Sequence, residues 1–448
     1  MHKEIISNFA RFGEEPSLVF HGEVCTYGGL SLDIGTMERL LDERSVAPGG
    51  VVAIEGTYSP KNCALLLALI ANGNIVVPLP PGPAAKRQEY LDVSEAECRI
   101  APAGNGEWTV ERTGRDATHA LYGRLRGLGA PGLVLFSSGT TGRSKASVLN
   151  FAKLLGRYDT TQRRPRRTLA FLSLDHIGGI NTLMHTLSQG GCIVTVAERT
   201  PRAIFKAIEA HKVDTLPTTP TFLTMCLMSG EATRHDLSSL RLITYGTEPM
   251  PMQTLRKLNA ALPQVRLKQT YGLSEVGILP TASRSNDSLW VKLGTSGFDH
   301  KIIDGILWIR SDMAMLGYLN APAAFDEDGY FNTQDAVEVD GEYVRILGRK
   351  SELINVGGEK VYPNEVESVL LEVDNVVEAT VSGKPNAVTG MVVQALVRVA
   401  RPEPPQQTVA RIREHCRGRL QPFKIPALID VTDREQHSDR FKKVRVAS

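Results

Sequence analysis

Residues 136–145 read Phe-Ser-Ser-Gly-Thr-Thr-Gly-Arg-Ser-Lys and follow the apolar run Leu133-Val134-Leu135. The apolar run predicts a buried strand, and the glycines predict a loop after it. Glycine lets backbone N–H groups approach an anion closely, while hydroxyls and a lysine ammonium complete a phosphate cradle. The G-x-x-x-x-G-K-[ST] spacing of a Walker P-loop is absent. The segment therefore indicates a nucleoside triphosphate site on a different fold, although by itself it is equally consistent with a polar surface turn.

The composition is that of an ordinary globular protein. The chain has 448 residues, of which 22% are charged, and its net charge is +2. This length predicts two or three domains, and the charge balance offers no nucleic-acid signal. The six cysteines are scattered without a C-x-x-C pair, which favours reduced thiols in the cytoplasm over a zinc site or a disulfide framework.

The most apolar stretch covers residues 63–79 and is interrupted by Asn72-Gly73-Asn74. It is too short to span a bilayer, which requires about 20 apolar residues. We therefore expect a buried helix, a turn and a buried strand here, and no membrane partner.

Strand-like and helix-like segments alternate between residues 50 and 310, which predicts α/β units with mostly parallel sheets. The expected strands are 51–54, 75–79, 192–196 and 240–244, and the expected helices are 62–70, 203–211 and 252–261. Two hairpins follow, with tight turns at Asp304-Gly305 and Asp340-Gly341. They predict a small β-barrel-like part at the end of a large N-terminal domain.

The segment after Gly348-Arg349 has the pattern of a small α+β domain. It contains helix-like residues 364–372 and 409–420, strand-like residues 376–381 and 392–399, and a proline-rich loop at 401–405. We therefore divide the chain into an N-terminal domain, 1–347, and a C-terminal domain, 348–448, joined at a polar hinge.

Seven motifs occur in order along the chain. They are the loop at 137–145, Ser-Leu-Asp-His-Ile-Gly-Gly at 173–179, Tyr-Gly-Thr-Glu-Pro at 245–249, Thr-Tyr-Gly-Leu-Ser-Glu at 270–275, Tyr-Phe-Asn-Thr-Gln-Asp at 330–335, Gly-Arg-Lys-Ser-Glu at 348–352 and Val-Gly-Gly-Glu-Lys at 356–360. This series resembles the adenylate-forming superfamily of acyl-CoA synthetases, luciferases and peptide synthetase adenylation domains. The resemblance covers essentially the whole chain and is nearest to acyl- and aryl-CoA ligases and stand-alone acyl-adenylating enzymes.

The resemblance implies an ATP site and the residues that form it. The phosphate loop would comprise Ser137, Ser138, Gly139, Thr140, Thr141, Gly142 and Lys145. The adenine walls would be Gly246, Thr247 and Glu248 on one side and Tyr271 and Gly272 on the other. Asp335 would bind the ribose hydroxyls, and Arg349 would reach the ribose or a phosphate.

The resemblance also implies a reaction in two steps. A carboxylate attacks the α-phosphate of ATP, which yields an acyl-adenylate and pyrophosphate, and the acyl group then passes to a thiol while the C-terminal domain rotates. Ser274 would face the carboxylate or the α-phosphate, and Glu275 would hold Mg²⁺, a cation that prefers oxygen ligands. Gly357 and Gly358 would let a pantetheine arm pass close to the backbone.

Three positions depart from the family pattern. Gln334 replaces the glycine of Thr-Gly-Asp, Ser351 stands at the hinge position, and Phe441 replaces the glycine before the catalytic lysine. The Lys-x-x-Arg spacing favours Lys442 as that lysine, with Lys443 as the alternative. These departures keep open a degenerate homologue that binds nucleotide without turnover.

The segment around His176 bears on the acid. An aspartate in this region usually pairs the ammonium of an amino-acid substrate, and Asp175 could serve that purpose. His176 before Ile-Gly-Gly fits the acid-pocket segment of acyl- and aryl-CoA ligases better. We therefore expect a small carboxylic acid without an α-amino group, with amino-acid activation as the alternative. The acceptor thiol is either CoA or the phosphopantetheine of an acyl or peptidyl carrier protein.

Overall fold

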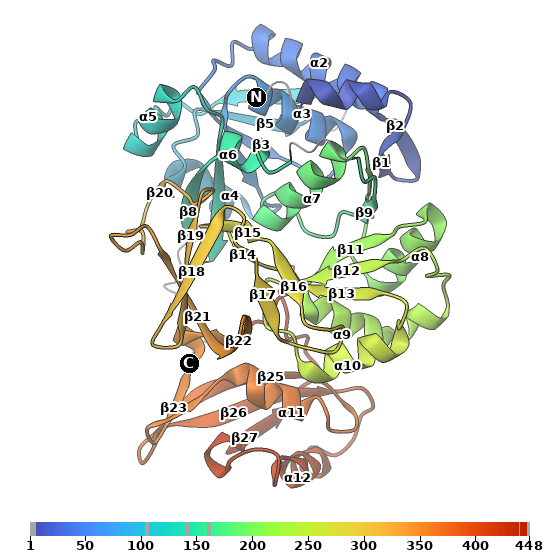
Figure 1. Cartoon of the computed structure of the whole chain (residues 1–448), viewed down its shortest axis with the longest axis vertical. Helices are drawn as coiled ribbons and strands as arrows, with labels where there is room; N and C mark the ends of the chain where they lie inside the picture. The colour runs from blue at the N-terminus through green and yellow to red at the C-terminus, as the bar shows by residue number, and fades with distance from the viewer. Residues whose placement is uncertain (1–5, 104–106, 139–143, 159–162, 439, 446–448) are drawn as a thin grey trace.

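The structure is a computed structural model that describes residues 6–103, 107–138, 144–158, 163–438 and 440–445. Its upper part in Figure 1 holds two seven-stranded sheets with helices packed around them, and a smaller domain lies below. The expected α/β architecture, with a barrel-like part and a separate α+β domain, is confirmed.

The first sheet has a parallel centre and antiparallel edges. Its order is β20 (Gly317–Tyr318), β8 (Ser144–Asn150), β7 (Gly132–Ser138), β4 (Ile75–Leu79), β3 (Val51–Glu55), β5 (Cys98–Pro102) and β6 (Trp108–Arg112). The helices nearest to it in sequence are α2 (Tyr27–Glu43), α3 (Pro60–Ala71), α4 (Ala84–Val93), α5 (Ala120–Gly127) and α6 (Phe151–Leu155). Residues 62–71 of α3 are all buried, as expected for a helix that is apolar on every face. The described helices include no segment with the length and apolar character of a membrane span.

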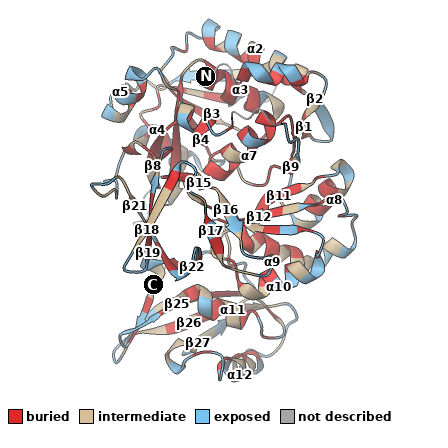
Figure 2. Cartoon of the chain, viewed as in Figure 1, coloured by how far each residue is buried: buried red, intermediate tan, exposed pale blue. Residues whose placement is uncertain are grey.

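The second sheet is parallel apart from its last strand. Its order is β13 (Arg266–Gln269), β12 (Leu242–Tyr245), β11 (Thr215–Thr218), β9 (Arg167–Leu169), β10 (Cys192–Val194), β1 (Pro16–Phe20) and β2 (Glu23–Thr26). The associated helices are α7 (Ile177–Ser188), α8 (Pro201–His211), α9 (Pro220–Ser229) and α10 (Met252–Ala261). Figure 2 shows the strands of both sheets as largely buried, since helices cover them. Such strands are apolar in runs, which is why the sequence pattern located them.

An antiparallel sheet connects these layers to the C-terminal domain. Its order is β16 (Thr281–Ser283), β17 (Val291–Leu293), β22 (Tyr343–Arg349), β21 (Phe331–Asp340), β19 (Ile306–Ser311) and β18 (Phe298–Ile303), and β14 (Tyr271–Leu273) pairs with β15 (Gly277–Leu279) nearby. Asp304 and Gly305 both have positive φ angles, 51° and 75°, as the two-residue hairpin turn requires. Both predicted hairpins are present, and the second is formed by β21 and β22.

The C-terminal domain has one sheet and two helices. The strands are β24 (Glu359–Val361), β23 (Ile354–Val356), β26 (Gly390–Val399), β25 (Val376–Asn386) and β27 (Leu428–Val431), and the helices are α11 (Pro363–Leu370) and α12 (Pro405–Cys416). The expected helix at 409–420 was misplaced by four residues. Proline suits the first turn of a helix, so Pro405 begins α12 instead of belonging to the preceding loop. Arg417 is extended, and it ends the helix early.

Candidate active site

Three predicted nucleotide contacts meet at one buried carboxylate. Asp335 in β21 is 6% exposed. The Tyr271 hydroxyl donates to its Oδ2 at 2.5 Å, and Arg349 Nε lies 3.1 Å from its Oδ1. The antiparallel register of β21 and β22 places Asp335 opposite Arg349. Burial raises the pKa of Asp335, and Arg349 opposes that shift.

Glycines allow the two predicted adenine walls to lie next to each other. A Cβ atom on Gly246 would lie 2.6 Å from Thr270 Oγ1, beside the second wall, whereas one on Gly272 would lie 2.7 Å from the Gly277 carbonyl oxygen, within the β14–β15 pair. Any larger residue would push these segments apart. Thr247 follows with a φ of 74°, a left-handed conformation that is uncommon outside glycine.

Glu275 and Lys145 both contact the side chain of Tyr318. The Tyr318 hydroxyl donates to Glu275 Oε1 at 2.7 Å, and Lys145 Nζ lies 5.3 Å from the centroid of the Tyr318 ring. The loop containing Ser274 and Glu275 connects β14 to β15. The carboxylate of the fourth motif and the cation of the first are therefore neighbours in space.

The phosphate loop falls between β7 and β8 in the sequence. Ser137 pairs in register with Lys145, and Ser138 is the last residue of β7. The predicted contacts Gly139, Thr140, Thr141 and Gly142 lie outside the described residues.

His176 is the N-cap of α7. Its Nδ1 accepts from the backbone N–H of Gly178 at 3.0 Å, so the proton of the neutral ring is on Nε2. Burial and the nearby cations Lys442 and Arg440 lower the pKa of His176 well below its usual value. The side chain is therefore a neutral hydrogen-bond donor at physiological pH.

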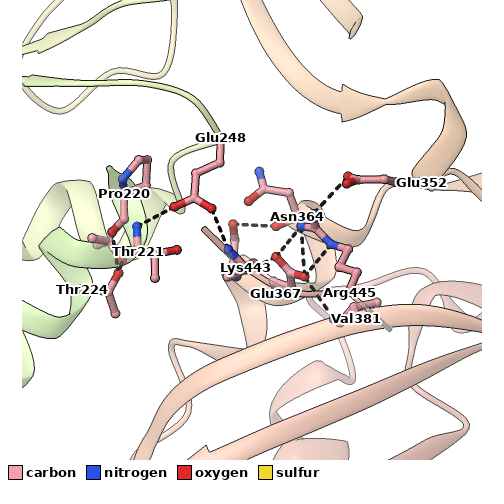
Figure 3. A network of polar contacts seen from close by, with 12 residues as sticks. Pro220, Thr221, Thr224, Glu248, Glu352, Asn364, Glu367, Val381, Lys443 and Arg445 are labelled. Atoms are coloured by element: carbon pink, nitrogen blue, oxygen red, sulfur yellow. Dashed lines mark hydrogen bonds and ion pairs between the residues drawn. The ribbon is translucent and has the colours of Figure 1, made fainter. Parts of the chain in front are cut away.

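The two C-terminal lysines have different surroundings. Lys443 Nζ is 2.7 Å from Oε2 of Glu367, a fully buried residue of α11, and Arg445 contacts the same carboxylate (Figure 3). Lys442 instead lies near His176 and Glu248. Burial lowers the pKa of Lys442 to about 8, although Glu248 opposes the shift.

Glu248 was expected to form part of a wall of the adenine pocket. Its side chain lies between the two domains. Its Oε1 accepts from Thr221 N at 2.7 Å, and its Oε2 accepts from Lys443 N at 3.1 Å (Figure 3). Its side chain therefore binds the start of α9 and the C-terminal segment.

Gly357 and Gly358 lie elsewhere, at the exposed turn between β23 and β24. Their φ angles are 61° and 93°, which favours glycine. Gly357 N donates to the Thr389 carbonyl, and Gly358 N donates to Asn355 Oδ1, so both hydrogen bonds remain within the C-terminal domain.

Sequence reasoning missed Tyr318, Glu367 and Arg440. Glu367 had a usable signal, because its spacing from Pro363 and Leu371 places a carboxylate on the apolar side of a helix. Tyr318 and Arg440 had none, since each acts on a residue far away in the sequence.

Two family models match the chain. "AMP-binding enzyme" covers residues 128–319, and "AMP-binding enzyme C-terminal domain" covers residues 365–442. The chain is 31% identical over 358 residues to the 3-[(3aS,4S,7aS)-7a-methyl-1,5-dioxo-octahydro-1H-inden-4-yl]propanoyl:CoA ligase of Mycobacterium tuberculosis, which covers 74% of this chain and 69% of that protein. It is 29% identical to the indoleacetate–CoA ligase of Aromatoleum aromaticum, and the match covers 88% of this chain and 87% of that protein.

Solved structures share the fold. An anthranilate CoA ligase in complex with anthranoyl-AMP superposes with a TM-score of 0.84 at 20% identity, covering 99% of this chain and 95% of that one. The o-succinylbenzoate CoA synthetase of Bacillus subtilis, in complex with its acyl-adenylate, superposes with a TM-score of 0.80 at 22% identity. This match covers 98% of this chain and 96% of that one. The family models and the CoA ligase relatives confirm the expected ATP-dependent activation of an acid and the transfer of its acyl group to a thiol. The chain belongs to the AMP-binding enzymes and is an AMP-forming acid–thiol ligase.

Proposed function

We propose that this enzyme activates a carboxylic acid without an α-amino group and transfers the acyl group to CoA, with Lys442 as the catalytic cation of the first step. The surroundings of Lys442 support this most directly, because its charge lowers the pKa of His176 and the neighbouring Arg440 pairs with Asp175, whereas Lys443 is paired with Glu367. The names of the two relatives also specify CoA and ring-bearing acids.

The surroundings of Asp175 argue against an amino-acid substrate. Asp175 is 6% exposed, and Arg440 Nη2 donates a hydrogen bond to its carboxylate. An aspartate that is already paired with a guanidinium has little capacity left for a substrate ammonium. Neutral His176 is the adjacent residue, and it suits a pocket for an uncharged acyl body.

In the first step both reactants are anionic, so the site must neutralise charge and hold the reacting atoms in line. Lys442 would approach the carboxylate and the α-phosphate, Lys145 the phosphates, and Asp335 the ribose hydroxyls. Tyr271, whose hydroxyl donates to Asp335, would lie against the adenine.

Glu275 fits a magnesium ion. Tyr318 donates to Oε1 of its carboxylate, and among the described residues no hydrogen bond to Oε2 competes with a metal. No group of three or more His, Cys, Asp or Glu side chains suited to a metal occurs among the described residues. Mg²⁺ is commonly held by one or two carboxylates together with substrate phosphates, and when bound it would neutralise phosphate charge.

The test is carboxylate-dependent pyrophosphate exchange with panels of aryl, fatty and amino acids, followed by CoA or carrier proteins. We expect an aryl or alkyl acid to support exchange and CoA to accept the acyl group. Exchange with amino acids only, or transfer only to a carrier protein, would contradict the respective part of the proposal. Exchange with none of the acids would contradict the proposed substrate class as a whole.

The role of Lys442 is tested by comparison with its neighbour. Lys442→Met should reduce adenylation by about 10²–10³-fold, as the loss of one preorganised electrostatic contact does, and leave transfer from a supplied acyl-adenylate largely intact. Lys443→Met should instead lower the free energy of unfolding, because it leaves Glu367 less well paired. The opposite pattern would assign the catalytic role to Lys443.

A further inference from the structure

The residue before Lys442 binds the C-terminal segment to the N-terminal domain. The centroid of the Phe441 ring lies 5.3 Å from that of Phe171 and 5.2 Å from that of Phe222. Phe222 belongs to α9, and both partner rings are buried in the core beside the second sheet. The Arg199 guanidinium lies 5.2 Å from the Phe441 centroid and 5.8 Å from the Phe171 centroid. The ring therefore contacts the N-terminal core from another domain.

The backbone of Phe441 is held in place as well. Its φ is 52°, in the left-handed region that disfavours residues with a Cβ. Thr219, the N-cap of α9, donates from Oγ1 to the Phe441 carbonyl oxygen at 2.7 Å. A strained conformation of this kind persists only where the surroundings specify it.

Arg440 makes a second contact across the interface. Its guanidinium donates to the carboxylate of Asp175, a side chain that is 5% exposed. Asp175 is the residue directly before His176. On the other side of Lys442, the Lys443 N–H donates to Glu248. Lys442 is thus bracketed by contacts to the N-terminal domain.

We propose that Phe441 and Arg440 are positioning residues that bias the enzyme toward the domain orientation with Lys442 at the acid site. The inference rests on the proposed role of Lys442 and deepens it. The aromatic contacts and the ion pair both cross to the N-terminal domain, so rotation of the C-terminal segment for thiol transfer would break them. Removing them lowers the population of the adenylating orientation and raises that of the transferring one.

The first experiment measures the domain orientation without any substrate. Leu32 is 76% exposed in α2, and Val388 is 91% exposed in the C-terminal domain. Both are replaced by cysteine for spin labelling in a Cys25→Ser background, because the other cysteines are buried. We expect one dominant interdomain distance in the parent chain and a broader or shifted distribution with Phe441→Gly. Phe423→Ala is the matched control, since Phe423 packs within the C-terminal core, and it should leave the distribution unchanged.

The second experiment separates the half-reactions. Phe441→Gly should slow adenylate formation at least tenfold and leave transfer from a supplied acyl-adenylate equal or faster. Arg440→Met should act in the same direction, and Arg440→Lys should restore part of the rate because it keeps the charge. A purely structural role would lower both rates together, along with the unfolding temperature. That result, or an unchanged distance distribution with unchanged rates, overturns the proposal.

The outcomes distinguish this inference from the proposed function. If no acid supports adenylation in the parent chain, the proposed function fails, and the distance measurement still decides the positioning role. If Lys442→Met abolishes adenylation but neither Phe441→Gly nor Arg440→Met changes the ratio of half-reactions, the function stands and the positioning role fails. Should Phe441→Gly not fold, Arg440→Met carries both measurements.

Discussion

At the scale of the residue, two side chains occupy positions where the motifs of the adenylate-forming superfamily have glycine. Gln334 and Phe441 both adopt left-handed conformations, with φ angles of 61° and 52°. The backbone therefore keeps the conformation that favoured glycine, although the side chain has changed. Phe441 has aromatic partners that offset this strain, whereas Gln334 is exposed.

Gln334→Gly should stabilise the protein. The left-handed conformation costs an L-residue roughly 1–2 kcal/mol, and glycine gives back about 0.5–1 kcal/mol through its greater entropy in the unfolded chain. We expect a net gain in the free energy of unfolding of roughly 0.5–1 kcal/mol, measured by denaturant titration. Gln334→Ala is the control, because alanine keeps the strain. Equal stability of the two variants would show that this position is not strained.

Deprotonation of Lys442 should make the rate of adenylate formation fall at high pH. Its pKa is lowered to about 8, so the ammonium needed beside two anions is lost as the pH rises through this value. We expect kcat/KM for adenylate formation to fall above about pH 8, since kcat/KM reports groups of the free enzyme. Lys442→Arg should remove this fall because arginine does not titrate in this range. A fall that survives in that variant belongs to another group.

At the scale of the element, α11 organises the end of the chain. The Glu367 carboxylate accepts hydrogen bonds from the side chains of Lys443 and Arg445 and from the backbone N–H of Val381 in β25 (Figure 3). Burial alone would raise the pKa of Glu367, but Lys443 and Arg445 hold it below its ordinary value. Its stabilising contribution is therefore present above the pKa of the unfolded chain and lost as the pH falls through the folded one.

Glu367→Gln should destabilise the C-terminal domain by roughly 3–5 kcal/mol, because it removes the buried carboxylate that pairs with the partly buried Lys443 and Arg445. Thermal and denaturant unfolding would measure this loss. Glu365→Gln on the same helix removes only an exposed partner of Lys424, and should change stability by less than about 1 kcal/mol. Similar effects of the two variants would rule out a special role for the buried pair.

At the scale of the whole molecule, the segment around Lys442 contacts the N-terminal domain, while Gly357 and Gly358 form an exposed turn whose hydrogen bonds stay within the C-terminal domain. The residues that we propose for the two half-reactions therefore have different surroundings in this structure. Rotation of the C-terminal domain is the change that would exchange them. The contacts it must break are those of Phe441, Arg440 and Lys443 with the N-terminal domain.

This predicts a change in hydrogen exchange. With a stable acyl-adenylate analogue and CoA bound, the segment 440–445 should exchange faster than with ATP alone, since the Lys443 N–H loses Glu248 as its partner. The amides of β25 and β26 should be unchanged, because the core of the C-terminal domain moves as one unit. Unchanged exchange in 440–445 would show that CoA binds without rotation.

The sequence alone predicted much of the fold. Buried parallel strands, the all-apolar α3 and the Asp-Gly hairpin turn of β18 and β19 depend on local composition and were found from it. The ends of helices were predicted less accurately, as the four-residue shift of α12 shows. Asp335, Tyr271 and Arg349 were each assigned to the nucleotide from separate motifs, and the structure brings them into contact.

What the sequence by itself determined is the class of chemistry, because each motif places the necessary residue types within a few positions of one another. It left Lys442 and Lys443 nearly equivalent, since adjacent residues share the same local pattern. Only the tertiary structure separated their surroundings, through Glu367, Glu248 and His176. The same holds for Asp175, whose partner Arg440 lies 265 positions away. Partners so distant are set by the packing of domains, which no local pattern records.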